Sequence, residues 1–349
     1  MGRSPYLPAV LSAVLFGLST PLAKLLLRDV SPLLLAGGLY LGAFLGLSAF
    51  DLGRRLHGRR DAKPAPLTSK DLPWLAGAVV AGGIVGPICL LFGLARLRGI
   101  TASLLLNLEA AATALIAVIL FHEYAGSRLW FALAAMTGAS VLLSWDPASG
   151  AFAWSGALLI LGAMTAWGFD NNFTRVISGK DPVRIAQIKG LVAGTFSLFL
   201  AVSLGQRIPT GPILAFGLVV GALSYGLSLV LYIRALSGLG AFRAGAVFGA
   251  APFVGALASL AILGDRPTWP MAAGAALMLL GVTAVFGERH VHLHRHPPLV
   301  HSHAHRHDEA HHRHGHRLPA GGTHSHEHAH EPTEHTHGHW PDLHHRHGH

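Results

Sequence analysis

The sequence predicts an all-α membrane protein, with ten transmembrane helices in two inverted five-helix repeats and a disordered C-terminal tail. Three observations predict this fold class. Of the 349 residues, 51% are hydrophobic and 12% are charged, whereas a soluble globular domain carries roughly 25% charged residues. Ten apolar segments are long enough to cross a bilayer. Motifs of the first half also recur in the second half.

The first five predicted spans form the first half of the chain. A membrane helix needs roughly 20 mostly apolar residues, and these spans are Leu7–Leu27, Leu33–Phe50, Leu72–Ala95, Ile100–Phe121 and Leu129–Trp145. The first contains Lys24 and runs on into further apolar segments, so we interpret it as a span and not as a cleavable signal peptide. The second carries Gly38, Gly42 and Gly46 on one face, which lets helices pack closely or leaves a face for a homodimer.

The last five predicted spans are Trp154–Thr174, Ile185–Leu204, Ile213–Leu236, Ala241–Leu263 and Trp269–Gly287. The connections between spans are short and rich in Gly, Pro, Asp and Arg, which are the residues that turns favour. The longest connection, Asp51–Asp71, is polar and strongly basic.

Basic residues predict which ends of the spans face the cytoplasm. With the N-terminus inside, thirteen cations of the connections fall on the cytoplasmic side and five on the other: the thirteen are Arg54, Arg55, Arg59, Arg60, Lys63, Lys70, Arg128, Arg175, Lys180, Arg184, Lys189, Arg234 and Arg243. This bias predicts a multi-pass protein of an inner (plasma) membrane with both termini in the cytoplasm. We therefore attribute the excess of Lys and Arg to the orientation of the chain in the membrane and not to nucleic-acid binding.

The entries to spans one and six indicate an internal duplication. Phe16-Gly17 and Trp167-Gly168 each place a cation, Lys24 or Arg175, seven residues after the glycine. An X-Pro step follows in each half, at Ser31-Pro32 and Asp181-Pro182.

Spans four and nine also match. Leu108-Glu109-Ala110-Ala111 parallels Ala250-Ala251-Pro252-Phe253 at an offset of 142. We therefore predict a first repeat at residues 1–146 and a second at residues 147–288. Five spans is an odd number, so the two copies would have opposite orientations in the bilayer, an arrangement typical of secondary transporters.

Several short motifs together resemble a known family. They are Phe16-Gly17 with Pro21, Ala102-Ser103-Leu104-Leu105 leading to Leu108-Glu109, His122-Glu123, Gly138-Ala139, Ala251-Pro252 and Gly264-Asp265. The chain resembles the drug/metabolite transporter (DMT) superfamily over residues 7–287, specifically its EamA-type ten-helix transporters. It departs from the family pattern at Ala110, His122 and Asp170-Asn171-Asn172. The resemblance implies an inner-membrane carrier with a central cavity that exports or exchanges small organic solutes.

Glu109 and Asn107 are candidate substrate or coupling residues in span four. Polar groups at this depth are costly and usually face a cavity or a partner. Glu109 is either a substrate ligand or protonatable coupling group, or a structural carboxylate paired with a cation from another helix.

Asp170, Asn171 and Asn172 are further candidates in the last turns of span six. On a helix they point in three directions, so they cannot all face one cavity. Asp170 either lines the cavity, or the group lies at the cytoplasmic interface and caps the helix or pairs with Arg175.

Lys24 and Tyr225 complete the candidate set in the body. Lys24 either extends to the interface as a snorkelling side chain or binds an anionic substrate. Tyr225 is a candidate cavity aromatic, with packing as the alternative.

Residues 289–349 form a histidine-rich tail that we expect to be disordered without metal and to lie in the cytoplasm. Twenty-three of the 25 histidines lie here, and neutral imidazole is a common ligand of transition metals. The candidate ligands are His301, His303, His305, His307, His311, His312, His314, His316, His324, His326, His328 and His330. The body requires no cofactor, and the tail is expected to bind a divalent Zn, Ni, Co or Cu ion.

The pattern as a whole favours secondary transport of a small solute, by efflux or exchange, and not an enzyme. No nucleotide-binding motif G-x-x-x-x-G-K-[ST] occurs, so transport would use ion or solute gradients. Two alternatives remain open: a transition-metal transporter loaded by the tail, and a membrane-anchored metal buffer or sensor. The expected partners are the lipid bilayer, the solute and metal ions.

Overall fold

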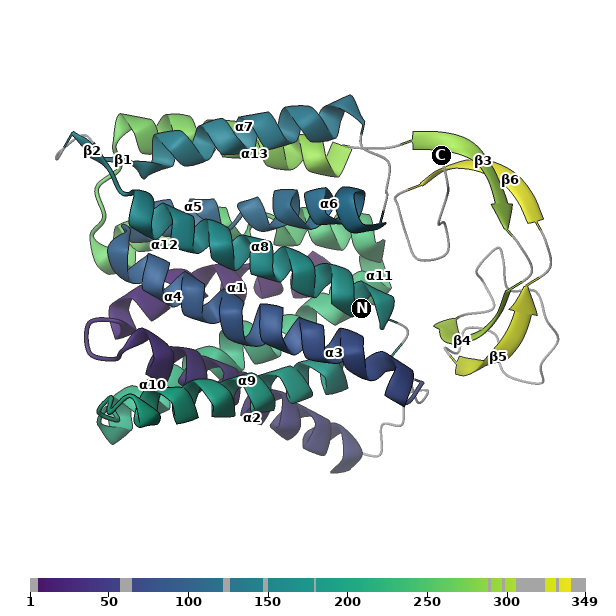
Figure 1. Cartoon of the computed structure of the whole chain (residues 1–349), viewed down its shortest axis with the longest axis horizontal. Coiled ribbons are helices and arrows are strands. Elements are labelled where there is room, and N and C mark those ends of the chain that lie inside the picture. The colour runs from purple at the N-terminus through teal and green to yellow at the C-terminus, as the bar shows by residue number, and fades with distance from the viewer. Residues whose placement is uncertain are drawn as a thin grey trace.

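The computed structural model describes residues 6–56, 65–121, 126–146, 150–178 and 180–287, with tail segments 290–296, 299–305, 324–330 and 333–339. The helices of the first half are α1 (Tyr6–Leu26), α2 (Pro32–Leu56), η1 (Ser69–Asp71), α3 (Leu72–Ala78), η2 (Val79–Val85), α4 (Gly86–Arg96), α5 (Gly99–Leu105), α6 (Leu108–Phe121) and α7 (Ser127–Ser144). A short hairpin, β1 (Trp145–Asp146) with β2 (Ala151–Phe152), leads to the second half. That half contains α8 (Trp154–Val176), α9 (Pro182–Ser203), α10 (Gly211–Gly221), η3 (Ala222–Leu227), α11 (Ser228–Phe248), α12 (Ala251–Leu263) and α13 (Trp269–Gly287). The helices lie side by side with their long axes roughly aligned (Figure 1).

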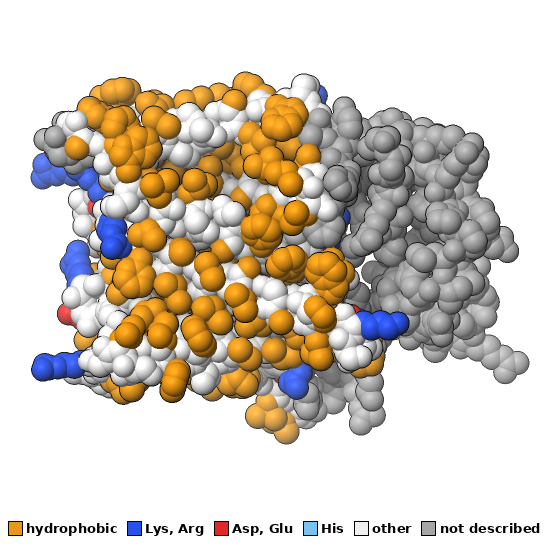
Figure 2. All heavy atoms as spheres, in the orientation of Figure 1, with side chains coloured by type: hydrophobic (Ala, Val, Ile, Leu, Met, Phe, Trp, Pro, Cys, Tyr) orange, Lys and Arg blue, Asp and Glu red, His pale blue; other side chains and the backbone are white. Residues whose placement is uncertain are grey.

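The helices have the length and composition of membrane spans. Within the part of the chain that the structure describes, seven helical stretches are long and apolar enough to cross a bilayer: Tyr6–Leu26, Pro32–Arg54, Ser69–Arg96, Gly99–Leu120, Ser127–Ser144, Pro182–Ser203 and Gly211–Ala235, with shorter apolar helices at Ala251–Leu263 and Trp269–Ala284. Hydrophobic side chains cover the face shown in Figure 2, and Lys and Arg gather towards the ends of the helices. Helices suit this setting because they satisfy every backbone polar group internally. The chain is therefore a helical, multi-pass membrane protein.

Two predicted spans are irregular in the first half, and their irregularities recur in the second. The third predicted span contains the π-helical segment η2, and the eighth contains η3. The fourth is interrupted between α5 and α6 at residues 106–107, and a second interruption separates α11 from α12 at residues 249–250. Both interruptions are closed by i→i−3 hydrogen bonds, such as Asn107 N–H to Leu104 O and Ala250 N–H to Val247 O.

The predicted connection between spans eight and nine, at residues 237–240, is wrong. Helix α11 continues through this stretch to Phe248, and the first non-helical residues are Gly249 and Ala250. The stretch contains glycines but no proline. A glycine costs a helix only about 1 kcal/mol relative to alanine, so the backbone hydrogen bonds of the helix continue across it.

Helices from opposite halves pack against one another throughout the bundle. Helix α2 packs against α9, α5 against α12, and α7 against α13. Helix α1 packs on α11 and α12, while α8 packs on α4 and α6. The α7–α13 pair forms one edge of the bundle in Figure 1.

Glycines permit the closest approach of α2 to α10. A Cβ at Gly42 would overlap the carbonyl oxygen of Leu218, and one at Gly221 would overlap that of Leu39. Small residues at helix contacts are the usual means of close packing in lipid. Gly42 therefore serves packing within the chain.

The tail differs from the disordered segment that the sequence predicts. It contains β3 (His290–His296), β4 (Leu299–His305), β5 (His324–His330) and β6 (Thr333–His339), with β3 antiparallel to β6 and β4 antiparallel to β5. Alternating His-X-His has the two-residue period of a strand, and antiparallel pairing satisfies its backbone groups. The strands lie beyond one end of the helical bundle (Figure 1). Their register places histidine opposite histidine, for example His292 opposite His337 and His303 opposite His326.

Candidate functional site

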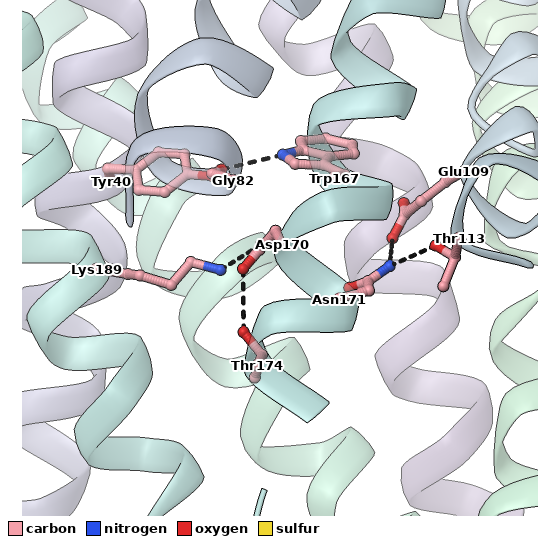
Figure 3. A network of polar contacts seen from close by, with 9 residues as sticks. All are labelled: Tyr40, Gly82, Glu109, Thr113, Trp167, Asp170, Asn171, Thr174 and Lys189. Atoms are coloured by element: carbon pink, nitrogen blue, oxygen red, sulfur yellow. Dashed lines mark hydrogen bonds and ion pairs between the residues drawn. The ribbon is translucent and has the colours of Figure 1, made fainter. Parts of the chain in front are cut away.

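The polar residues of α8 are held by three different sets of contacts. Asp170 is buried and pairs with Lys189 of α9 (Figure 3). The Thr174 hydroxyl donates to the other carboxylate oxygen of Asp170 at 3.1 Å. Asp170 is thus paired with a cation of the neighbouring helix. Acids inside a membrane usually either pair in this way or face a water-filled cavity.

Lys189 has a role that the sequence reasoning missed. The charge bias groups it with the cations of the cytoplasmic connections, but it lies inside α9 and contacts Asp170. The available signal was its position within the predicted span Ile185–Leu204, because a cation inside a span needs a partner.

Gly82 makes room for the Asp170 carboxylate. A Cβ at Gly82 would overlap the carboxylate group. The Gly82 carbonyl oxygen accepts two hydrogen bonds, from the Tyr40 hydroxyl at 2.6 Å and from the Trp167 indole N–H at 3.1 Å. Gly82 lies in the π-helix η2, and such irregular turns are frequent at functional sites. Nothing in the sequence pattern indicates this π-helix.

Asn171 connects α8 to α6. Its amide donates to Glu109 Oε1 at 2.8 Å and to the Thr113 hydroxyl at 3.1 Å (Figure 3). Asn171 is exposed and Glu109 is partly exposed. Asn172 points elsewhere: it is buried and its amide donates to the backbone oxygens of Thr113 and Gly168. The three adjacent polar residues therefore have three different environments, as helical geometry requires.

Glu109 lies in the first turn of α6, directly after the interruption at residues 106–107. Asn107 does not accompany it. The Asn107 side chain is buried and its amide donates to the Leu104 backbone oxygen at 3.1 Å, so it caps the end of α5. Of these two candidates in span four, Glu109 is the one that reaches the α8 polar residues.

An aromatic row lies alongside these polar groups. We define it as Tyr40, Tyr225, Phe16, Phe248 and Tyr232. Successive ring centroids in that order are 6.0, 5.8, 5.2 and 4.7 Å apart. All five side chains are partly exposed. Tyr40 joins the row to the polar groups, because its hydroxyl donates to the Gly82 carbonyl oxygen and Gly82 lies against the Asp170 carboxylate.

Lys24 lies apart from this site. The Lys24 ammonium donates to the backbone oxygens of Leu94 and Ala95 at 2.7 and 3.2 Å. It thus binds the last carbonyls of α4, a favourable place for a cation. Among the described residues, no group of three or more His, Cys, Asp or Glu side chains could hold a metal ion.

The predicted metal ligands of the tail fall into two sets. His301, His303, His305, His324, His326, His328 and His330 lie on β4 and β5, while His307, His311, His312, His314 and His316 lie outside the described residues. The structure describes the tail strands through their backbone, so metal binding there stays a prediction.

Comparisons with known proteins give one consistent result. The model of the EamA-like transporter family matches residues 3–145 and, again, residues 154–287. A Methanothermobacter thermautotrophicus protein called "Uncharacterized transporter" is 25% identical over 296 residues, 80% of this chain and 85% of its own length. An uncharacterized Pseudomonas aeruginosa protein is 33% identical over 187 residues, 53% of this chain and 63% of its own. A solved crystal structure has a TM-score of 0.57 at 18% identity, over 81% of this chain and 96% of that one, and so has the same overall fold.

Proposed function

The chain belongs to the EamA-like transporter family, and on that premise we propose that it is a secondary transporter. It moves a small solute across the inner membrane, by efflux or exchange, with both termini in the cytoplasm. The observation that carries this proposal is the Glu109–Asn171–Thr113 cluster. Its Glu109 is a partly exposed carboxylate near the middle of the helical stretch Gly99–Leu120, directly after the interruption between α5 and α6. Ionisable groups in such places mark substrate or ion pathways by default.

The arrangement of the two halves supports alternating access. Each half matches the family model separately, and each contains a π-helical segment followed by an interrupted span. Helices pair across the halves, α2 with α9 and α5 with α12. We propose that the halves are inverted repeats whose relative rocking opens the central site to either side. Discontinuous helices near the midplane are the usual place for substrate in such folds.

Glu109 is the residue on which transport should depend most. The test is the full chain in proteoliposomes, with a panel of labelled amines, amino acids, organic acids and sugars under an imposed proton gradient. We expect gradient-driven, protein-dependent flux of at least one solute, and we expect Glu109→Gln to abolish it or uncouple it from the gradient. Asp29→Asn is the matched control, because Asp29 is an exposed acid in the turn between α1 and α2. Full coupled flux in Glu109→Gln would remove the coupling role.

We also propose that the tail binds a divalent transition metal, separately from transport. Its support is the density of histidines and the strand register that faces His303 with His326. Imidazole suits Zn, Ni, Co and Cu. Zinc, nickel and cobalt flux should be compared between the full chain and a version ending at Gly287, with circular dichroism as the folding control. Metal flux that falls on truncation would instead make the protein a metal carrier loaded by its tail.

A further inference from the structure

Two arginines from opposite halves of the chain lie against one aromatic ring. The Cζ atoms of Arg54 in α2 and Arg234 in α11 lie 5.9 and 5.4 Å from the centroid of the Phe50 ring. The two guanidiniums are therefore separated by no more than these two distances combined. The face of the ring attracts each cation, but the two cations repel each other. A bound anion would remove that repulsion.

Close packing of α2 against η3 and α11 brings the two arginines together. A Cβ at Gly226 of η3 would lie 3.2 Å from the Ala43 carbonyl oxygen, a tight contact. About two helical turns further along both helices, Arg234 meets Phe50. The two helices therefore run in the same direction and reach one end of the bundle together. The backbone packing thus places the two arginines at the same level.

The arginines lie where the membrane-spanning stretches end. Arg54 closes the stretch Pro32–Arg54, and Arg234 is the residue before the end of Gly211–Ala235. The C-terminal end of α2 lies at the end of the bundle where the tail begins (Figure 1). Leu227, about two turns before Arg234 on the same helical face, is exposed. A lipid whose head group meets the arginines would lay an acyl chain along this apolar surface.

The charge around the arginines is positive. Asp51 beside Phe50 supplies one carboxylate, yet residues 51–63 contain five Lys or Arg and two Asp. A basic cluster directly after a membrane helix is typical of segments that bind anionic lipids. Each guanidinium carries five N–H donors, so one that already has a partner still has donors for a phosphate.

We propose that Arg54 and Arg234, which we call the arginine pair, bind the phosphate of an anionic phospholipid. The planar guanidinium fork matches phosphate geometry, and one lipid would join α2 of the first half to α11 of the second. A zwitterionic lipid is a poorer partner, because its own cation meets two like charges. In the orientation proposed above this is the cytoplasmic leaflet, where anionic lipids lie. The site takes a lipid and not the transported solute, so it does not depend on transport.

The experiment compares lipids of different charge on the delipidated full chain in a nonionic detergent. Dioleoylphosphatidylglycerol is the anionic probe and dioleoylphosphatidylcholine the zwitterionic one, and native mass spectrometry counts the lipids bound at each concentration. Glycerol 3-phosphate and inorganic phosphate are added separately as competitors. We expect phosphatidylglycerol to bind about 20-fold more tightly than phosphatidylcholine, from the two arginines together. Neither soluble phosphate should displace it at equal concentration, because both lack the acyl chains.

Variants test the arginine pair against general surface charge. Arg54→Gln and Arg234→Gln should each weaken phosphatidylglycerol binding about fivefold, and the double variant should bind the two lipids alike. Phe50→Leu keeps both charges and removes the ring that gathers them, so it should weaken binding about twofold. Arg28→Gln is the matched control, because Arg28 is an exposed arginine in the turn between α1 and α2, at the other end of α2.

The outcomes are distinct. Equal binding of the two lipids, or unchanged binding in both single variants while they elute and melt like the unmodified chain, would overturn the inference. An equal loss in Arg28→Gln would also overturn it, because it would assign the preference to charge spread over the surface. Displacement by glycerol 3-phosphate or inorganic phosphate would overturn the lipid assignment in favour of a soluble anion. Lipid binding as expected, with no flux of any solute in proteoliposomes, would support the site and count against the transport proposal alone.

Discussion

The two halves of the body have similar backbones and dissimilar charges. Both contain a π-helical segment, η2 or η3, and both contain an interruption, at 106–107 or 249–250. The aligned motifs place Ser19 at the position of Asp170 and Ala251 at the position of Glu109. Ser19 and Ala251 are both buried. The two halves thus share the irregular backbone features around the site, whereas the acids Asp170 and Glu109 occur only in one half each and have neutral residues at the matching positions.

The Asp170–Lys189 pair should give the largest effect when one member is removed. Lys189→Leu leaves Asp170 buried without its cation, and breaking such a pair costs about 3–5 kcal/mol. We expect a large fall in the thermal unfolding temperature of the purified protein. The measurement is differential scanning fluorimetry in one detergent, with size-exclusion elution as the check for folding.

A double variant turns this loss into a test of the comparison. The X-Pro steps align Lys189 with Leu39, so Asp170→Ser with Lys189→Leu gives the second half the residues of the first. Replacing a buried pair by neutral residues is often nearly neutral for stability. We expect most of the lost stability to return. A double variant as unstable as the single one would mean that the ion pair holds α8 against α9 and does more than neutralise its own two charges.

Gly82→Ala should give the next largest effect. The added Cβ would overlap the Asp170 carboxylate, and inserting a methyl group into such packing costs about 1–3 kcal/mol. Gly38→Ala is the matched control, because a Cβ there meets nothing within 4 Å. That control should be neutral or stabilising by up to about 1 kcal/mol, since alanine favours helix. Equal unfolding temperatures for the two variants would contradict the close contact.

The sequence was sufficient for features that depend on local composition. The length of apolar segments predicted where helices lie, and the rarity of acids inside them singled out Glu109 and Asp170. The same arguments did not find the Asp170–Lys189 contact, because it joins two helices and hydrophobic periodicity says nothing about which helices touch. They also placed a connection at residues 237–240, where α11 continues.

Other parts of the site depend on backbone details that composition does not encode. Asn107 and Glu109 are two residues apart in the sequence, yet one caps Leu104 and the other meets Asn171. That separation follows from the interruption at residues 106–107. The π-helix η2 likewise decides that Gly82 faces Asp170. The tail strands follow the two-residue period of His-X-His, which a low-complexity composition typical of disorder obscures.

The hydrogen bond from Tyr40 to Gly82 should give the smallest of these effects. Tyr40→Phe keeps the ring and removes one of the two donors to the Gly82 oxygen, while Trp167 still donates. Loss of one such bond costs about 1 kcal/mol, so a small fall in unfolding temperature is expected in the same fluorimetry series. The second half has Tyr225 in η3 where it packs with Tyr40, and Tyr225→Phe leaves the Gly82 oxygen with both its donors. A fall in Tyr40→Phe that Tyr225→Phe does not share would assign it to the Gly82 bond. Equal falls would mean that the bond to Gly82 contributes no more than the Tyr225 hydroxyl, which hydrogen-bonds with Ser19, and the π-helix η2 would then depend on its packing against Asp170 more than on the bond from Tyr40.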